Sequence, residues 1–280
     1  MTVESPARVW LSGASEGIGL AAALAFARAG AHVAICARRP GPLATAARAL
    51  EAAGAASVAQ VSADVASPAG VDAFADAALA ALGGVDILVH AAGGGGPAPT
   101  LASDDATFES DWAYAFGVNL MGAARLARRA APHLPDGRGA IALVSSAFGF
   151  QAMDITAPSY GATKAGLHHL TVTLARELAP RHPRRRHRLG PVWTEHRERD
   201  LQRDAAESGR DPEGLRAEPT PRWAPSTPLA APHRRGRPRH QAGLTSPDAS
   251  FITGTTVAVD GGYVRAPAES PFSSRPRPRW

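Results

Sequence analysis

The chain is poor in cysteine, in long apolar stretches and in metal-ligand patterns. Cys36 is the only cysteine among 280 residues, which excludes an intramolecular disulfide and a cysteine-based metal site. No apolar run reaches the ~18 residues of a membrane-spanning helix, and residues 1–6 lack the basic-then-apolar order of a secretion signal. The ten histidines show no ligand spacing. We therefore expect a cytoplasmic protein without a metal and without a membrane partner.

The excess of positive charge is confined to one part of the chain. Residues 1–180 carry ten arginines and one lysine against fourteen acids, a net charge of −3, whereas residues 181–280 carry nineteen arginines against eleven acids, a net charge of +8. A basic block suggests nucleic-acid binding, and salt-dependent retention on DNA would test for it. This block lacks interleaved aromatic residues and any binding motif, so we expect no nucleic-acid partner.

A glycine-rich turn lies near the start of the chain. An apolar stretch from Arg8 leads into glycines at positions 13, 17 and 19, and the Ala-rich run 20–29 follows. Glycines let a backbone approach a pyrophosphate closely, and free N–H groups at a helix start hold the anion. Taken alone, the segment is also compatible with an ordinary tight turn. The pattern that follows it favours dinucleotide binding.

Short apolar runs alternate with helix-forming segments along the next part of the chain. We predict strands over 32–37, 57–61, 85–91 and 140–146, and helices over 42–53, 68–82, 104–131 and 158–179. This alternation indicates an α/β protein with a Rossmann-type, doubly wound parallel sheet and helices on both faces. We expect a single domain over 1–265, followed by a disordered tail rich in proline and arginine over 266–280.

Tyr160 and Lys164 are four residues apart in a predicted helix, so both side chains lie on one face. Ser146 comes fourteen residues before the tyrosine. With the glycine turn and with Asp64-Val65, His90-Ala91-Ala92-Gly93, Asn119 and Asp260-Gly261-Gly262, the chain resembles the short-chain dehydrogenase/reductase family, in particular its 3-oxoacyl reductases and ketoreductases. The resemblance covers residues 7 to about 180, 190–194 and 246–262. Ser12 replaces the threonine, and His90-Ala91 the two asparagines, that this family prefers, which predicts looser hydrogen bonding at the end of the fourth strand.

The resemblance implies an oxidoreductase in which Tyr160 is the acid/base, Ser146 donates a hydrogen bond to the substrate and Asn119 holds a water next to Lys164. Free tyrosine has a pKa of roughly 10, so activity near pH 7 needs a stabilisation of roughly 4 kcal/mol. An ammonium about 4 Å away supplies roughly that much at an effective dielectric constant near 20. Taken alone, Ser146 and Ser145 are also typical of hydroxyls that cap their own backbone, an interpretation we favour for Ser145, and Asn119 of a polar residue inside a helix.

The end of the second predicted strand indicates the cofactor. Arg38 and Arg39 stand where NAD-dependent enzymes carry a carboxylate that binds the ribose, so NADP is favoured over NAD. Glu16 in the glycine turn argues weakly against NADP. Both arginines are also compatible with a solvated loop. The cofactor contacts that the resemblance implies are Gly13, Ser15, Gly17, Ile18, Gly19, Arg38, Arg39, Asp64, Val65, Gly93, Tyr160, Lys164, Val192 and Thr194.

The resemblance also implies a small-molecule carbonyl or alcohol substrate and, if the C-terminal elements fold, a homo-oligomer that is either a dimer or a tetramer. The loop after Ser146 contains Phe148, Phe150, Met153 and Ile155, which favours an apolar carbonyl compound, although aromatic residues in a loop as often serve packing alone. The alternative is a catalytically silent Rossmann-fold protein that binds a dinucleotide without turnover. Such a protein has no need of Ser146, Tyr160 and Lys164 together.

Two segments conflict with this fold. Residues 181–189 hold five arginines and Pro183 where the family has a buried strand, and residues 219–243 are rich in proline, arginine and histidine where it has a helix. Read one base later with GC-rich codons, residues 181–188 can encode Gly-Ile-Arg-Val-Asp-Ala-Ile-Ala, an apolar strand. We therefore hypothesise a compensated frameshift, which resequencing of the coding DNA would test. We predict that 181–189 stays out of the sheet and leaves the edge beyond the fifth strand poorly covered. A damaged reductase with little activity is therefore an alternative to the active enzyme for the polypeptide as written.

Overall fold

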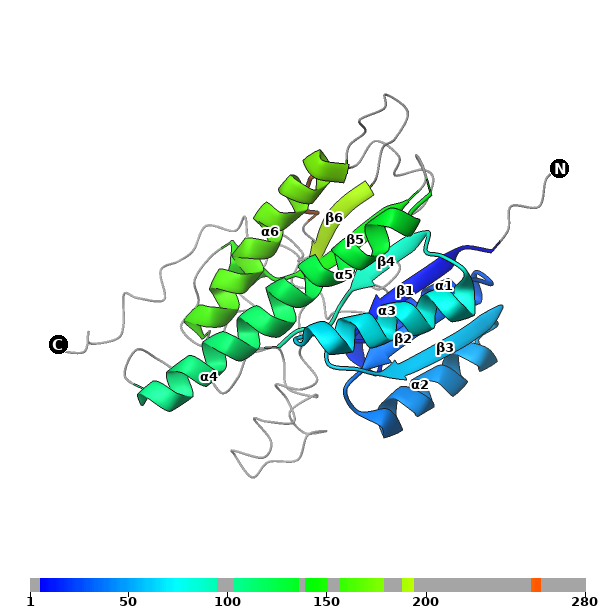
Figure 1. Cartoon of the computed structure of the whole chain (residues 1–280), viewed down its shortest axis with the longest axis horizontal. Helices are drawn as coiled ribbons and strands as arrows, with labels where there is room; N and C mark the ends of the chain where they lie inside the picture. Colours follow the sequence, from blue (N-terminus) through cyan, green and yellow to red (C-terminus); the bar gives the residue numbers. More distant parts are fainter. Residues whose placement is uncertain are drawn as a thin grey trace, which may run out of the picture.

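Six parallel strands form one sheet in the order β3-β2-β1-β4-β5-β6 (Figure 1). The computed structural model describes residues 6–94, 103–135, 139–150, 157–178, 188–193 and 253–257, with the backbone alone for 188–193. The strands are β1 (Arg8–Ser12), β2 (His32–Ala37), β3 (Ser57–Ser62), β4 (Ile87–His90), β5 (Ala140–Ser145) and β6 (Arg188–Trp193). The helices are α1 (Gly17–Arg28), α2 (Pro40–Ala52), α3 (Pro68–Leu82), α4 (Asp105–Ala115), α5 (Gly122–Ala130) and α6 (Pro158–Leu178). The strand order reverses between β1 and β4, which confirms the predicted doubly wound Rossmann-type sheet.

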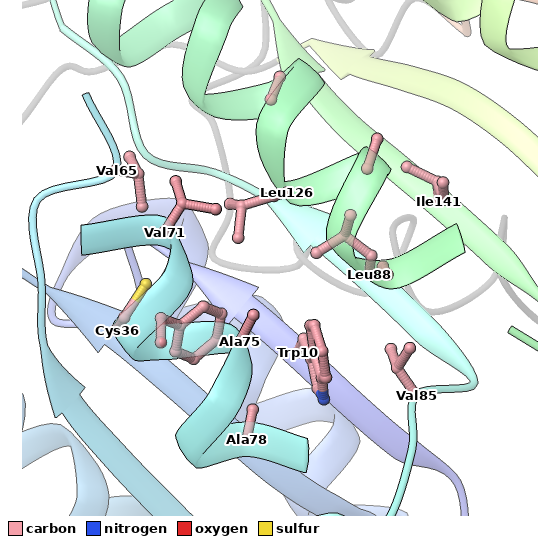
Figure 2. Packing of buried hydrophobic residues seen from close by; sticks show 14 of the residues in the cluster. Trp10, Cys36, Val65, Val71, Ala75, Ala78, Val85, Leu88, Leu126 and Ile141 are labelled. Atoms are coloured by element: carbon pink, nitrogen blue, oxygen red, sulfur yellow. The ribbon is translucent and has the colours of Figure 1, made fainter. Parts of the chain in front are cut away.

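Alternate residues of each central strand face opposite helical layers. Trp10 of β1 and Leu88 of β4 join an apolar cluster with α3, α5 and α6, and Figure 2 shows Trp10 beside Ala75 of α3. The residues that alternate with them along β1 and β4, and the corresponding residues of β2, join a second cluster with α1 and α2. These residues are Val9, Leu11, Val33, Ile35, Ile87 and Val89. Strands buried on both faces read as continuous apolar runs, and for this reason they are recognisable in the sequence.

Helix α3 shows how local signals fix an element. The Ser67 side chain accepts a hydrogen bond from the backbone N–H of Gly70, and a proline follows at the first helical position. Gly83 ends the helix in the left-handed conformation, with a φ of 71°. These signals are readable in the sequence, and the predicted bounds 68–82 are those of the structure. None of the described helices is long and apolar enough to cross a membrane.

The long helix predicted over 104–131 has an interruption that the sequence did not reveal. Between α4 and α5 lies one π-helical segment, η1 (Phe116–Met121), so the path continues but the register of the backbone hydrogen bonds changes. Single π turns inside α-helices occur frequently at functional sites. This one carries Asn119.

The prediction of an uncovered sheet edge beyond β5 is wrong. Strand β6 begins at Arg188 and pairs with β5 from Ala140↔Arg188 to Ser145↔Trp193, so the last two residues of 181–189 do enter the sheet. Gly190 to Trp193, which we expected after the strand, form most of it. Pro191 has no N–H for a ladder, and in the described part of the chain β6 stands at the sheet edge, where proline is tolerated. Residues 181–187 and 219–243 lie outside the described residues, as does the tail 266–280.

Candidate active site

The glycine turn packs directly against the loop that follows β4. Gly13 has a φ of 72°, and a Cβ there would lie 2.4 Å from the backbone nitrogen of Ala92. A Cβ on Gly19 would lie 2.1 Å from the carbonyl oxygen of Gly13. Only glycine fits at these two positions, because backbone faces backbone. The turn is therefore held close to the loop after β4, at the point where the strand order reverses.

The start of α1 fits an anionic group. Its N-cap residue, Glu16, makes no side-chain cap hydrogen bond, and its first turn carries no acidic residue. The first N–H groups of a helix favour an anion through hydrogen bonding and through the helix dipole. Ser15 and Ile18 are half-buried and Gly17 is exposed in the same turn, so these residues are in a position to hold a pyrophosphate.

Two arginines follow β2, and their partners differ. The Nη2 of Arg39 lies 2.7 Å from Oε2 of Glu16, so each neutralises the other's charge. The Nη2 of Arg38 donates to the hydroxyl of Tyr114 at 3.3 Å, and Ser62 Oγ donates to the Arg38 carbonyl at 3.0 Å. Glu16, which argued against NADP in the sequence, is therefore offset by Arg39.

Asp64 and Val65 follow β3 at the same edge of the sheet. Oδ1 of Asp64 accepts the backbone N–H of Ala66 at 3.0 Å, which fixes the turn, and Val65 is buried. A carboxylate that is exposed at a strand end remains accessible to a ligand.

Lys164 lies in the interior next to Tyr160. Its Nζ donates to the carbonyl of Val144 at 2.8 Å and lies 5.5 Å from the centroid of the Tyr160 ring. Only 3% of the residue is exposed, and this burial lowers the lysine pKa to about 7. The edge of the Phe148 ring meets the Tyr160 ring at a centroid distance of 6.0 Å. The pair on one helical face is therefore present as predicted.

Asn119 connects the π turn with two other parts of the site. Its Oδ1 accepts the N–H of Gly94 at 3.0 Å, and its Nδ2 donates to the Gly94 carbonyl at 3.0 Å and to Thr163 Oγ1 at 3.1 Å. A Cβ on Gly93 would lie 2.7 Å from Asn119 Oδ1 and 3.1 Å from Lys164 Nζ. Gly93 therefore keeps open the space between these two polar groups. These bonds also fit the alternative of a structural polar residue inside a helix, so the role of Asn119 in the reaction stays a prediction.

The two serines at the end of β5 have different partners. The Oγ of Ser146 accepts the N–H of Phe148 at 3.3 Å, as the capping interpretation predicts. The same interpretation of Ser145 is wrong, because its Oγ donates to the Lys164 carbonyl at 2.9 Å and contacts His168 Nε2 at 2.7 Å. Ser145 therefore links the end of β5 to the backbone of α6 at Lys164.

A buried contact between Ser12 and His90 was missed in the sequence. Nδ1 of His90 lies 2.8 Å from Ser12 Oγ, and Nε2 lies 3.1 Å from the carbonyl of Val118. Because that carbonyl only accepts, Nε2 carries the proton and Nδ1 accepts from the serine. The expected loosening at the end of β4 is therefore wrong. The two residues stand opposite each other in parallel register, which is the signal that could have paired them.

The remaining predicted positions lie on β6 or beyond it. Val192 pairs with Val144 through the backbone, whereas Thr194 lies outside the described residues, as do Met153 and Ile155. Among the described residues no group of histidine, cysteine and acidic side chains could hold a metal ion.

Comparison with known proteins agrees with this geometry. Residues 7–185 match the family described as short chain dehydrogenase. The chain is 36% identical over 263 residues to 3beta-hydroxysteroid dehydrogenase 1 of Eggerthella lenta, which covers 92% of this chain and 94% of that protein. It is 35% identical over 261 residues to galactitol 2-dehydrogenase (L-tagatose-forming) of Cereibacter sphaeroides, covering 90% and 93%.

A solved structure has the same fold. L-sorbose reductase from Gluconobacter frateurii, solved in complex with NADPH and L-sorbose, superposes with a TM-score of 0.79 at 29% identity, over 93% of this chain and 98% of that one. Sequence, topology and relatives agree, and the chain is a member of the short-chain dehydrogenase family of oxidoreductases.

Proposed function

We propose that the chain transfers hydride between NADP(H) and a small-molecule carbonyl or secondary alcohol, with Tyr160 as the acid/base. The observation that carries this proposal is the buried ammonium site of Lys164 beside the Tyr160 ring, 5.5 Å from its centroid. A solvated Tyr-Lys pair on a helix surface would have no reason to bury the cation. A dinucleotide-binding protein without turnover would not need it either.

In the reductive direction, bound NADPH supplies the hydride and Tyr160 gives its phenolic proton to the carbonyl oxygen. The tyrosinate that results is stabilised by the Lys164 ammonium, whose pKa rises in turn as the negative charge develops next to it. Because burial lowers the Lys164 pKa to about 7, the charge of this lysine can respond to the charge on Tyr160 near neutral pH. Ser146 donates a hydrogen bond to the substrate oxygen, and Asn119 holds a water that connects Lys164 with solvent.

The cofactor preference rests on Arg38. No carboxylate follows β2, and the guanidinium of Arg38 donates its hydrogen bond to the hydroxyl of Tyr114 rather than to an acid. A guanidinium without a neutralising carboxylate suits a 2′-phosphate. The related L-sorbose reductase was solved with NADPH, which supports the same choice.

A Tyr160→Phe variant tests the chemistry. We expect carbonyl-dependent oxidation of NADPH to fall by at least about a thousandfold, because the transferred proton is removed, while NADPH still binds. Glu177→Gln, at an exposed position of the same helix, serves as the control and should keep its activity. A phenylalanine variant that retains more than a few per cent of the activity would refute the role of Tyr160.

An Arg38→Ala variant tests the cofactor. NADPH binding, measured by titration calorimetry, should weaken by roughly ten- to a hundredfold, while NADH binding changes little. Equal losses for the two cofactors would show that Arg38 only supports its loop. A preference of the unmodified protein for NADH would overturn the NADP assignment itself.

A homo-oligomer is part of the proposal. Phe116 and Met121 of η1 and Val172 of α6 are exposed by 40%, 41% and 42%, and a second copy of the chain would cover such apolar side chains. Light scattering coupled to gel filtration measures the assembly, and a monomer at micromolar concentration would contradict it.

A further inference from the structure

We infer that Tyr114 is a specificity-determining residue, which holds the Arg38 guanidinium in place for the 2′-phosphate of NADP(H). This inference rests on the proposed NADP preference and adds to it a residue of α4, 76 positions away in the sequence. It starts from the contrast between the two arginines that follow β2. Arg39 is paired with the carboxylate of Glu16, whereas the partner of Arg38 carries no charge.

The contact between Arg38 and Tyr114 has two components. The Nη2 of Arg38 donates to the phenolic oxygen at 3.3 Å, and Cζ lies 5.4 Å from the ring centroid. A cation within about 6 Å of an aromatic ring is attracted by the electrons of its face. Both components favour the charged guanidinium and neither cancels its charge. Since a guanidinium has five N–H donors, the contact with Tyr114 leaves others for a phosphate.

Tyr114 also lies close to the loop that follows β4. A Cβ on Gly94 would lie 3.4 Å from the phenolic oxygen, so Tyr114 stands directly beside the loop that follows β4. The backbone of Arg38 is fixed separately, because Ser62 Oγ donates to its carbonyl at 3.0 Å. An exposed arginine loses much side-chain freedom when it binds a phosphate. A guanidinium already held by Tyr114 loses less, and this gain applies only to the cofactor that carries the 2′-phosphate.

The test compares two replacements of Tyr114. Tyr114→Leu removes both ring and hydroxyl and should weaken NADPH binding about two- to fivefold, the factor that corresponds to an exposed cation–π contact, without changing NADH binding. Tyr114→Phe keeps the ring and should lose less. Phe108→Leu, near the start of the same helix and remote from Arg38, is the matched control and should change neither cofactor. Calorimetric titration with 2′,5′-ADP and with 5′-AMP gives the same comparison without turnover, and thermal melting checks that each variant folds.

A double-mutant cycle separates this inference from the proposal on which it rests. If Arg38→Ala weakens NADPH selectively, Tyr114→Leu in that background should have no further effect, because there is no guanidinium left to hold. If Arg38→Ala is selective but Tyr114→Leu leaves 2′,5′-ADP binding unchanged or weakens 5′-AMP equally, the role of Tyr114 is refuted while the NADP proposal stands. If Arg38→Ala itself shows no selectivity, the NADP proposal fails first, and the role of Tyr114 fails with it.

Discussion

Replacing His90 by asparagine should remove a large acid sensitivity from the stability of this protein. The imidazole is fully buried between Ser12 and Val118, and this burial, together with the charge of Lys164, lowers the His90 pKa to about 3. Hydrogen bonds to the backbone act in the opposite direction but are weaker. Lys164, with a pKa of about 7, is protonated below neutral pH, so its repulsion acts throughout the acid range.

The sign and the size of the effect follow from linkage. The folded-state pKa lies below the ordinary value of 6.5, so the contribution of neutral His90 is complete above pH 6.5 and is lost as the pH falls toward 3. From pH 6.5 to pH 4, at about 1.36 kcal/mol per unit, His90 alone removes about 3 kcal/mol from the free energy of unfolding. This is a large part of the ~5–15 kcal/mol that a typical domain has in total.

The assay is urea unfolding of the unmodified protein and of His90→Asn at several pH values between 7 and 4. The variant loses up to about 1–3 kcal/mol at pH 7, because asparagine does not reach both Ser12 and Val118. That loss should shrink and then reverse as the pH falls, since asparagine takes up no proton. Carboxylates titrate equally in both proteins and cancel in the difference. Parallel pH profiles for the two proteins would refute the reasoning.

Two further predictions concern the catalytic groups. Lys164→Ala should raise the apparent pKa of the rate of alcohol oxidation by about 1–3 units, because the ammonium that stabilises tyrosinate is gone, and a pH–rate profile that stays in place would contradict this. Gly93→Ala should lower kcat by about ten- to a hundredfold. The reason is that the alanine methyl group would lie 2.7 Å from Asn119 Oδ1 and 3.1 Å from Lys164 Nζ. Unchanged kinetics, in a variant whose melting temperature is also unchanged, would show that the reaction does not use the space between these two groups.

The sequence predicted those elements whose ends are marked locally. The strand over 32–37 and the helix over 68–82 have the predicted bounds, because Gly30, Ser67 and Gly83 mark ends that need no distant partner. The π turn Phe116–Met121 was not predictable in this way. Its cause is tertiary, since Asn119 binds the Gly94 backbone and a Cβ on Gly122 would lie 3.0 Å from the Val65 carbonyl.

The site shows the same division. The helical spacing of Tyr160 and Lys164 is enough to predict that they share one face, and Lys164 does lie beside the Tyr160 ring. Ser12 and His90 looked like two independent departures from the family pattern. They are partners, because parallel strands β1 and β4 bring their carboxyl ends together. The sequence separates these residues by 78 positions, and only the strand order joins them.

The apolar packing limits what the arginine-rich segment can disturb. In the described part of the chain, both core clusters are built from residues that precede 179, and the strands from β1 to β5 pair without β6. The glycine turn, Arg38 and Tyr114 belong to this part. Strand β6 contacts only β5 among the described strands, on the side of Ser145 and Lys164 rather than of the dinucleotide turn. A change in residues 181–189 therefore acts on the sheet edge that carries Val192, a predicted cofactor contact, whereas the glycine turn and Arg38 should keep the packing that positions them.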